Sequence, residues 1–214
     1  MQKASLESLR EDYKKNTLNE NDLGKDPFSQ FETWFDEATA AKIHEPNAMN
    51  LSTVSKEGRP SARIVLLKGF NTNGFIFYTN YESKKGLQIL AHPFGALTFY
   101  WPELERQVRI EGKIARTGRE ASTAYFQSRP RGSQIGAIVS PQSQTIPGRE
   151  LLEERWAEYE ADDRPVFEKP DNWGGFQLTP DLIEFWQGRS SRLHDRLEYK
   201  LTDGGEWVIN RLAP

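Results

Sequence analysis

Apolar and polar positions change their spacing near residue 48 of this 214-residue chain. Before that point, Asp26 and Pro27 are typical of a helix start, and aromatic residues at helical spacing predict a helix that continues to about Ile43. Residues 1–25 are charged and poor in apolar side chains, so we expect a flexible N-terminal segment with room for a short lid helix over residues 5–14.

Beyond residue 48 the spacing is mostly that of strands. Glu57-Gly58 and Asn73-Gly74 predict hairpin turns. The predicted strands cover residues 48–55, 61–69, 74–80, 95–101, 107–116, 176–179, 182–187, 196–201 and 206–211. The predicted helices cover residues 83–90, 119–139 with a break at Pro130, and 150–161. This order favours one mainly β domain with helical additions (α+β) over residues 26–214, built as a closed or nearly closed barrel.

Composition removes several classes of function. The net charge of −3 gives no basic field for nucleic acid, so an anion site must be built locally. The chain has no cysteine, which excludes disulfides, thiolate metal sites and cysteine nucleophiles. No apolar run approaches the roughly 20 residues that span a bilayer, and the polar N-terminus resembles no signal peptide. We therefore expect a cytoplasmic protein.

Common cofactor and catalytic motifs are also missing. The chain contains no GxGxxG, P-loop, HExxH or GxSxG pattern, and its three histidines lie far apart. A metal site is therefore not expected. A redox cofactor, if there is one, would be organic and held without a covalent bond.

Two cationic segments are candidates for binding phosphate. RIVLLK, residues 63–68, is an apolar strand between two cations, although the spacing leaves open whether its charged ends simply reach water. In YTNYESKK, residues 78–85, hydroxyl groups and two lysines surround a predicted helix start, which is typical both of a phosphate site and of an ordinary capped helix.

Three further segments carry polar side chains suited to a small ligand. In ERQVRIEG, the amide of Gln107 can donate and accept hydrogen bonds at the edge of a heterocycle. Tyr125, Arg129 and Ser133 follow one another at intervals of four, so a helix would align them to bind a phosphate monoester, although a surface helix kinked at Pro130 with its arginines in water fits the same spacing. In the segment IEFWQGRSSRLHDR, His194 lies close to two arginines and a tryptophan and is suited to proton transfer.

Together these segments resemble the pyridoxine/pyridoxamine 5′-phosphate oxidase family. The motifs RIVLLK, FYTN, ERQVRIEG, SRPRGSQIGA, SPQS, WGGF, IEFWQG, RLHDR and RLAP occur in the family's order, and the resemblance runs from about Leu9 to Pro214. It implies an FMN-binding split β-barrel with Greek-key-like antiparallel strands. It further implies a homodimer with FMN at the subunit interface, acting on pyridoxine or pyridoxamine 5′-phosphate and O2.

The resemblance also implies roles for individual residues. FMN would contact Arg63, Ile64, Val65, Leu66, Leu67, Lys68, Tyr78, Thr79, Lys84, Lys85, Gln107, Gln142 and Ser143, together with Trp186 and Arg196 from the second subunit. The substrate would contact Arg10, Tyr13, Lys68, Tyr125, Arg129, Ser133, Arg192, Leu193 and His194. Arg192 and His194 would be the catalytic pair, which orients the substrate and assists proton removal while a hydride passes to the flavin.

Two positions depart from the pattern of the family. Lys84 stands where arginine is frequent, so a bidentate contact with phosphate is lost there. Glu45 stands where some relatives have aspartate, which would alter contacts of the lid.

Three other functions fit parts of the sequence. A non-catalytic flavin or pyridoxal-phosphate carrier would not need RLHDR, and a split-barrel flavin reductase would lack Tyr125, Arg129 and Ser133. A barrel that binds single-stranded nucleic acid would use a basic groove, which the net charge of −3 does not support.

Overall fold

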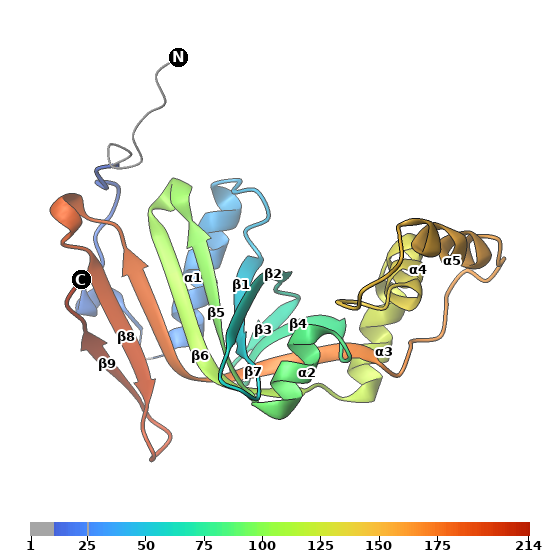
Figure 1. The fold of residues 1–214 in the computed structure, drawn as a ribbon. Helices are drawn as coiled ribbons and strands as arrows, with labels where there is room; N and C mark the ends of the chain where they lie inside the picture. The colour runs from blue at the N-terminus through green and yellow to red at the C-terminus, as the bar shows by residue number, and fades with distance from the viewer. Residues whose placement is uncertain (1–10, 25) are drawn as a thin grey trace. The chain divides into compact units, whose positions relative to one another are not determined.

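The computed structural model describes residues 11–24 and 26–214 (Figure 1). Its helices are α1 (Pro27–Ala40), α2 (Lys84–Ala91), α3 (Arg119–Ser128), α4 (Arg131–Val139) and α5 (Glu150–Glu160). Its strands are β1 (Ala48–Val54), β2 (Pro60–Leu66), β3 (Gly69–Asn71), β4 (Gly74–Asn80), β5 (Phe94–Trp101), β6 (Arg106–Arg116), β7 (Trp173–Gln187), β8 (Asp195–Leu201) and β9 (Trp207–Arg211). Within the described ranges, no helix combines the length and apolar character needed to cross a bilayer.

The strands form one sheet in the order β2-β1-β5-β6-β7-β4-β3, with β8 paired to β7 and β9 to β8. The residues divide between two compact units. Unit 1 contains the described residues up to Met49, together with Leu97–Glu111 and Pro180–Pro214. Unit 2 contains Asn50–Ala96 and Gly112–Thr179.

Aromatic side chains form the core of unit 1. Asp26 caps α1 by accepting hydrogen bonds from the N–H groups of Phe28 and Ser29, as the sequence predicts. The buried face of α1 then places Phe31 5.2 Å from Phe99 and Trp34 5.2 Å from Phe185, measured between ring centroids. Because each ring removes a large apolar area from water, this helix holds the unit-1 part of the sheet in place.

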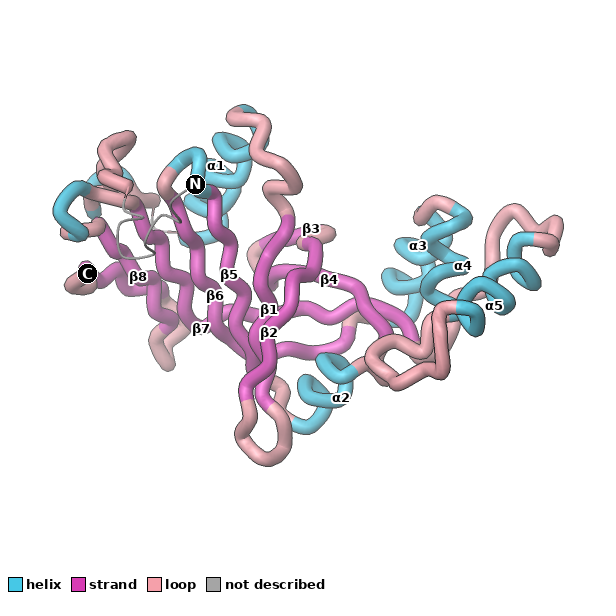
Figure 2. The backbone as a smooth tube through the Cα atoms, turned by 45° about the horizontal axis from the view of Figure 1, so that its top comes forward, coloured by secondary structure: helices cyan, strands magenta, loops and turns pink. Residues whose placement is uncertain are grey.

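Unit 2 combines a hairpin sheet with a helical cluster. Strand β4 pairs antiparallel with the first half of β7, and the rings of Phe77 and Phe176 meet at 5.8 Å. Figure 2 shows α3, α4 and α5 gathered beside one another, and their apolar residues pack around Phe126, Phe167 and Trp173. This arrangement brings α4 and the residues on either side of it close to the end of β4.

Most predicted elements are confirmed, and the main differences concern where a few of them end or join. The helix that begins at Pro27 ends at Ala40 rather than near Ile43, and Lys42 then adopts a left-handed φ of 56°. The predicted strand over residues 61–69 ends at Leu66, and a short strand, β3, follows at Gly69–Asn71. The two strands predicted over 176–179 and 182–187 are one continuous strand, β7, which includes Pro180.

Part of the N-terminal prediction, including residues 5–10, lies outside the described residues. Residues 11–14 are not helical, and the next regular element is a single 3-10 turn at Glu20–Asp22. Leu18 is buried, and its N–H donates to the carboxylate of Asp195 at 3.1 Å.

A close backbone approach explains Gly86 at the start of α2. A Cβ at this position would lie 2.2 Å from the carbonyl oxygen of Tyr81, so Gly86→Ala must displace the first turn of the helix. We expect this variant to lose at least about 2 kcal/mol of unfolding free energy in urea denaturation, because overpacking against backbone cannot be relieved by a side-chain rotation. Gly118→Ala, where a Cβ meets no atom within 4 Å, is the control and should lose less than about 1 kcal/mol.

Candidate active site

A cavity of about 340 Å³ in unit 2 gathers most of the residues that were predicted to contact FMN. It is lined by Arg63, Ile64, Val65, Leu66, Lys68, Tyr78, Thr79, Lys85, Tyr125, Arg129, Gln142 and Trp173. These residues come from β2 and the segment after it, the end of β4, the start of α2, the end of α3 and its junction with α4, the loop after α4 and the start of β7. Residues as far apart in sequence as Arg63 and Trp173 therefore line one cavity.

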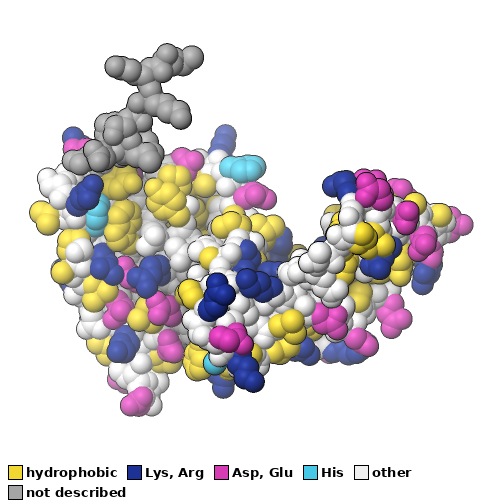
Figure 3. Space-filling model, viewed as in Figure 1, with side chains coloured by type: hydrophobic (Ala, Val, Ile, Leu, Met, Phe, Trp, Pro, Cys, Tyr) yellow, Lys and Arg dark blue, Asp and Glu magenta, His cyan; other side chains and the backbone are white. Residues whose placement is uncertain are grey.

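The cavity is strongly cationic. Four of its side chains are Arg63, Lys68, Lys85 and Arg129, and none of the described residues that line it is acidic. Figure 3 shows Lys and Arg side chains close together over the region of the strands β1 to β4. A local concentration of positive charge in a chain of net charge −3 is suited to a small anion.

Lys85 lies among neutral acceptors. Its ammonium donates to the Gln142 amide oxygen at 2.9 Å, to the Thr79 hydroxyl oxygen at 3.2 Å and to Ser83 Oγ at 3.3 Å. Burial, with a smaller contribution from the nearby Arg63 charge, lowers the pKa of Lys85 to about 8. An anion that enters the cavity would reverse this shift, because an opposite charge favours the protonated amine.

The α2 start places these groups as the sequence predicts. Ser83 caps the helix by accepting the N–H of Gly86 at 3.3 Å, so the N–H groups of the first turn lie beside Lys85. Arg63 is held from the other side, since its Nη1 donates to the Leu51 carbonyl at 3.0 Å and to Thr53 Oγ1 at 2.6 Å. Burial lowers the pKa of the Arg63 guanidinium.

Arg129 carries an unsatisfied donor. Its Nη1 is buried and has no hydrogen-bond partner among the described residues. The guanidinium carbon lies 4.8 Å from the centre of the Trp173 ring, and burial lowers the pKa of the side chain. Because a buried, unpaired charged donor is costly, this atom marks a position where an anionic acceptor fits.

Three stacked rings form one wall of the cavity. Tyr78 and Tyr125 stack with centroids 3.9 Å apart, and Trp173 lies parallel to them at 5.5 Å and 6.2 Å. Burial raises the pKa of both tyrosines, so their hydroxyls stay protonated at neutral pH and remain available as hydrogen-bond donors. Trp173 belongs to the motif WGGF, but its sequence context predicts no role for it in the site.

Ser133 lines a second cavity of about 300 Å³ that shares Tyr78, Thr79, Arg129, Gln142 and Trp173 with the first. The prediction that Tyr125, Arg129 and Ser133 lie along one helix is wrong. Arg129 has extended backbone angles, φ −71° and ψ 148°, because the following proline disfavours a helical conformation there. The break turns Arg129 towards both cavities, while Tyr125 and Ser133 each line one of them.

Unit 1 contains a second group of predicted residues, at the end of β7, in the loop that follows it and in the N-terminal segment. The His194 ring lies 4.6 Å from Trp186, and Tyr13 packs edge-on against Trp186 at 5.8 Å and at 5.9 Å from His194. Gly188 leaves room for Tyr13, since a Cβ there would lie 2.7 Å from its ring. Arg10, the other residue predicted in this segment, lies outside the described residues.

The loop that carries Arg192, Leu193 and His194 has an unusual backbone. Ser191 and Arg192 both have left-handed φ values, 57° and 61°, which cost about 1–2 kcal/mol for each such residue. Arg192 and Leu193 are exposed, Leu193 at 71%. Two strained residues that hold these side chains outward are typical of a ligand-binding loop.

Arg196 and Gln107 occupy different environments in unit 1. Arg196 donates to both carboxylate oxygens of the buried Glu184, at 2.8 Å and 3.0 Å, and to the Ala213 carbonyl. Glu184 also accepts from Arg109 at 3.1 Å. Gln107 is half-buried on β6.

Three predicted cofactor residues of unit 2 do not line the cavity. Leu67 is buried, whereas Lys84 and Ser143 are exposed, and Ser143 has a left-handed φ of 71°. Three residues with no predicted role hold the loop around His194, namely Arg189, Asp195 and Arg211. Their contacts depend on loop geometry that no local spacing predicts.

Comparison with known proteins identifies the family. A family model described as pyridoxamine 5′-phosphate oxidase matches residues 35–161. The protein named pyridoxine/pyridoxamine 5′-phosphate oxidase of Cupriavidus necator is 53% identical over 209 residues, which cover 98% of this chain and 99% of that protein. The chain belongs to the pyridoxamine 5′-phosphate oxidase family. Proteins of the same name from Acaryochloris marina and Burkholderia multivorans are 52% and 54% identical, each over 98% of the chain.

Other comparisons add the fold and a second region of the pyridoxamine 5′-phosphate oxidase family. A model described as the pyridoxine 5′-phosphate oxidase C-terminal dimerisation region matches residues 173–214. PhzG from Burkholderia lata, solved with tetrahydrophenazine-1-carboxylic acid, superposes with a TM-score of 0.88 at 28% identity, covering 93% of this chain and 98% of its own. A pyridoxamine 5′-phosphate oxidase-related, FMN-binding protein from Nostoc punctiforme has a TM-score of 0.72 at 21% identity, covering 90% and 100%. The predicted fold class, a mainly β split barrel with helical additions, is confirmed.

Proposed function

We propose that the chain is an FMN-dependent oxidase that converts pyridoxine 5′-phosphate and pyridoxamine 5′-phosphate to pyridoxal 5′-phosphate. The cationic cavity supports this proposal most directly, because it places an unpaired buried donor, Arg129 Nη1, beside three other cations. The names of relatives at 50–54% identity over nearly the whole chain point to the same substrates.

The residues of the unit-2 cavity fit FMN. Lys85, Thr79 and Gln142 already form a hydrogen-bonded group in which the ammonium has no anionic partner among the described residues, and a phosphate supplies the missing charge. Arg63 and the backbone of residues 64–68 would extend this contact along the ribityl chain and the ring. When bound, FMN would take a hydride from the substrate carbon and return the electrons to O2, which yields hydrogen peroxide.

The substrate phosphate would be bound by a separate set of groups. Arg129 would donate through its free Nη1, and Tyr125, Ser133 and Lys68 would complete the contact, because all four lie on the walls of the two adjoining cavities. Charge-assisted bonds from buried donors fix both the position and the orientation of such a ligand.

The loop residues of unit 1 would bind the pyridine ring and its reacting substituent. Arg192, Leu193 and His194 would contact the ring, and Tyr13, together with Arg10, would cover it. The match of residues 173–214 to a dimerisation region supports a homodimer, in which Trp186 and Arg196 complete the FMN site of the other subunit. Glu184 would hold Arg196 rigid, since both carboxylate oxygens accept from it.

A spectroscopic experiment tests this function. The purified protein, supplied with FMN, should be yellow, lose its flavin absorbance when pyridoxamine 5′-phosphate is added without oxygen, and regain it in air. Bleaching by a reduced nicotinamide but not by pyridoxamine 5′-phosphate would instead identify a flavin reductase. Failure to bind FMN under any condition would refute the proposal.

A further inference from the structure

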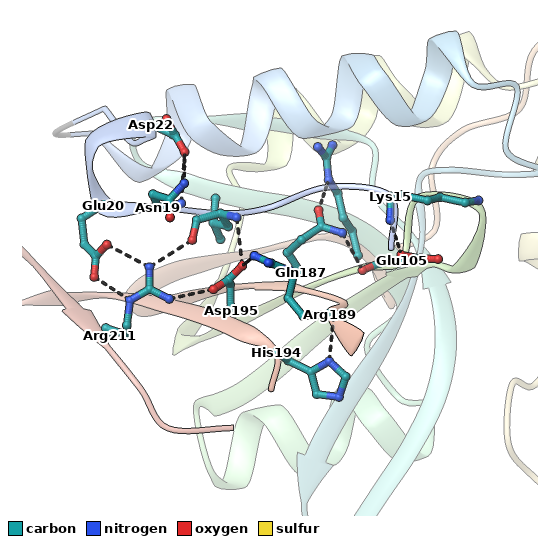
Figure 4. A network of polar contacts seen from close by, with 12 residues as sticks. Lys15, Asn19, Glu20, Asp22, Glu105, Gln187, Arg189, His194, Asp195 and Arg211 are labelled. Atoms are coloured by element: carbon teal, nitrogen blue, oxygen red, sulfur yellow. Dashed lines mark hydrogen bonds and ion pairs between the residues drawn. The ribbon is translucent and has the colours of Figure 1, made fainter. Parts of the chain in front are cut away.

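Two linked contacts hold the ring of His194 in place. Its Nδ1 accepts a hydrogen bond from the backbone N–H of Arg189 at 3.1 Å. The side chain of Arg189 donates in turn to Asp195 Oδ2 at 2.8 Å. Figure 4 shows this arrangement, in which Arg189 is held at its backbone by the imidazole and at its guanidinium by the carboxylate.

The contact at Nδ1 determines the protonation of the ring. A backbone N–H can only donate, so Nδ1 must be unprotonated, and a neutral imidazole then carries its hydrogen on Nε2. Protonation of Nδ1 would break the bond with Arg189. Burial and the charge of Arg192 also lower the pKa of His194, which favours the neutral ring at pH 7.

Asp195 is the acceptor that several groups of this network share. It is half-buried, and besides Arg189 it accepts the Leu18 N–H at 3.1 Å and Arg211 Nη1 at 2.8 Å. Arg211 is itself held by both carboxylate oxygens of Glu20, at 2.6 Å and 2.8 Å. Asp195 therefore has little freedom to turn away from Arg189, and the loop that bears His194 is held at a defined position.

We propose that Asp195 and Arg189 are positioning residues that hold His194 as the neutral tautomer protonated on Nε2, so that His194 donates a hydrogen bond to the substrate and does not accept a proton from it. This inference rests on the proposed function for the identity of the substrate, which would present an oxygen or nitrogen acceptor to Nε2. The proton lost from the substrate amine or hydroxyl then passes to another acceptor, such as water.

The test is ¹⁵N NMR of the full-length protein labelled at histidine. The chain has three histidines, and the His194→Asn variant assigns the signal of His194 by its loss. In the wild-type protein at pH 7.5, Nδ1 of His194 should show the shift of an unprotonated ring nitrogen and Nε2 that of a protonated one. A wild-type ring protonated on Nδ1 would overturn the proposal.

Three variants separate the branches of the network. Asp195→Asn and Arg189→Ala both remove the ion pair while leaving the backbone N–H in place, and both should give a mixture of tautomers and a fall in kcat/KM of about tenfold. Glu20→Gln, which alters only the contact with Arg211, should leave the tautomer unchanged. Retention of the wild-type tautomer in Arg189→Ala and Asp195→Asn would refute the positioning role.

The NMR measurement of the His194 tautomer does not depend on the proposed function. The tautomer is measured without substrate or turnover, so a protein that failed to oxidise pyridoxamine 5′-phosphate would still report the state of His194. If Asp195→Asn does not fold, Arg189→Ala alone decides the outcome, because Arg189 has no contact with Leu18 or Arg211 in the network of Figure 4.

Discussion

Arg129→Leu should raise the KM for pyridoxamine 5′-phosphate about 100-fold, because it removes a charge-assisted donor from a buried site where such bonds contribute about 1.5–3 kcal/mol each. Arg129 is the cation of the cavity whose Nη1 has no partner among the described residues, so its free donor is available to the ligand. Steady-state kinetics over a range of substrate concentrations measure the effect.

The substrate itself provides the control. Pyridoxamine without its phosphate lacks the group that Arg129 would bind, so its KM should change little between the wild type and Arg129→Leu. An equal loss for both compounds would show that the variant damages the site in general. An unchanged KM for the phosphorylated substrate would remove Arg129 from phosphate binding.

Lys85→Met should weaken FMN binding by at least about tenfold. The Lys85 ammonium bonds to Thr79, Ser83 and Gln142, whereas a thioether supplies neither a charge nor a hydrogen-bond donor. Fluorescence quenching of added FMN measures the affinity directly. Lys84→Met is the matched control, because Lys84 is the preceding residue but is exposed and does not line the cavity. Similar losses in the two variants would contradict a specific role for Lys85.

The pKa of Lys85 adds a second readout that needs no ligand. In the folded protein this pKa is lowered to about 8 from 10.5, so between these values the unfolded chain binds more protons than the native one. Stability of the FMN-free protein should therefore rise with pH from 8 to 10, and this rise should be smaller in Lys85→Met. Above pH 10 the buried Tyr199, with a pKa raised to about 12, acts in the opposite direction. Thermal unfolding across this range measures both effects.

Local sequence signals predicted the parts of the site that depend on local structure. The N-cap at Ser83, the turn at Glu57-Gly58 and the alternation of β6 all follow from residue type and spacing, and the structure confirms them. Nine of the residues predicted to contact FMN line the cationic cavity. That prediction came from the order of the motifs along the chain and not from composition.

Contacts between distant segments could not be predicted in this way. Serine and arginine rarely adopt left-handed backbone angles, so nothing in the sequence indicates that Ser191 and Arg192 do so here. The hydrogen bond between the Arg189 N–H and His194, which spans these two residues, was therefore not predicted. Trp173 was missed for a similar reason, since its role arises from stacking on Tyr78 and Tyr125, which lie at least 48 positions away. Arg129 was predicted to bind a phosphate both from its motif and as a helical neighbour of Tyr125, and the structure does not have that helical geometry at Arg129.

Strand β7 has a consequence for changes in chain length. It runs unbroken from Trp173 to Gln187, and its first half pairs with β4 while its second half pairs with β8. Because side chains alternate along a strand, inserting or deleting one residue near Pro180 would turn every side chain of one half to the opposite face. We therefore expect insertions and deletions to be better tolerated in the mostly exposed loop over residues 144–149 than anywhere along this strand.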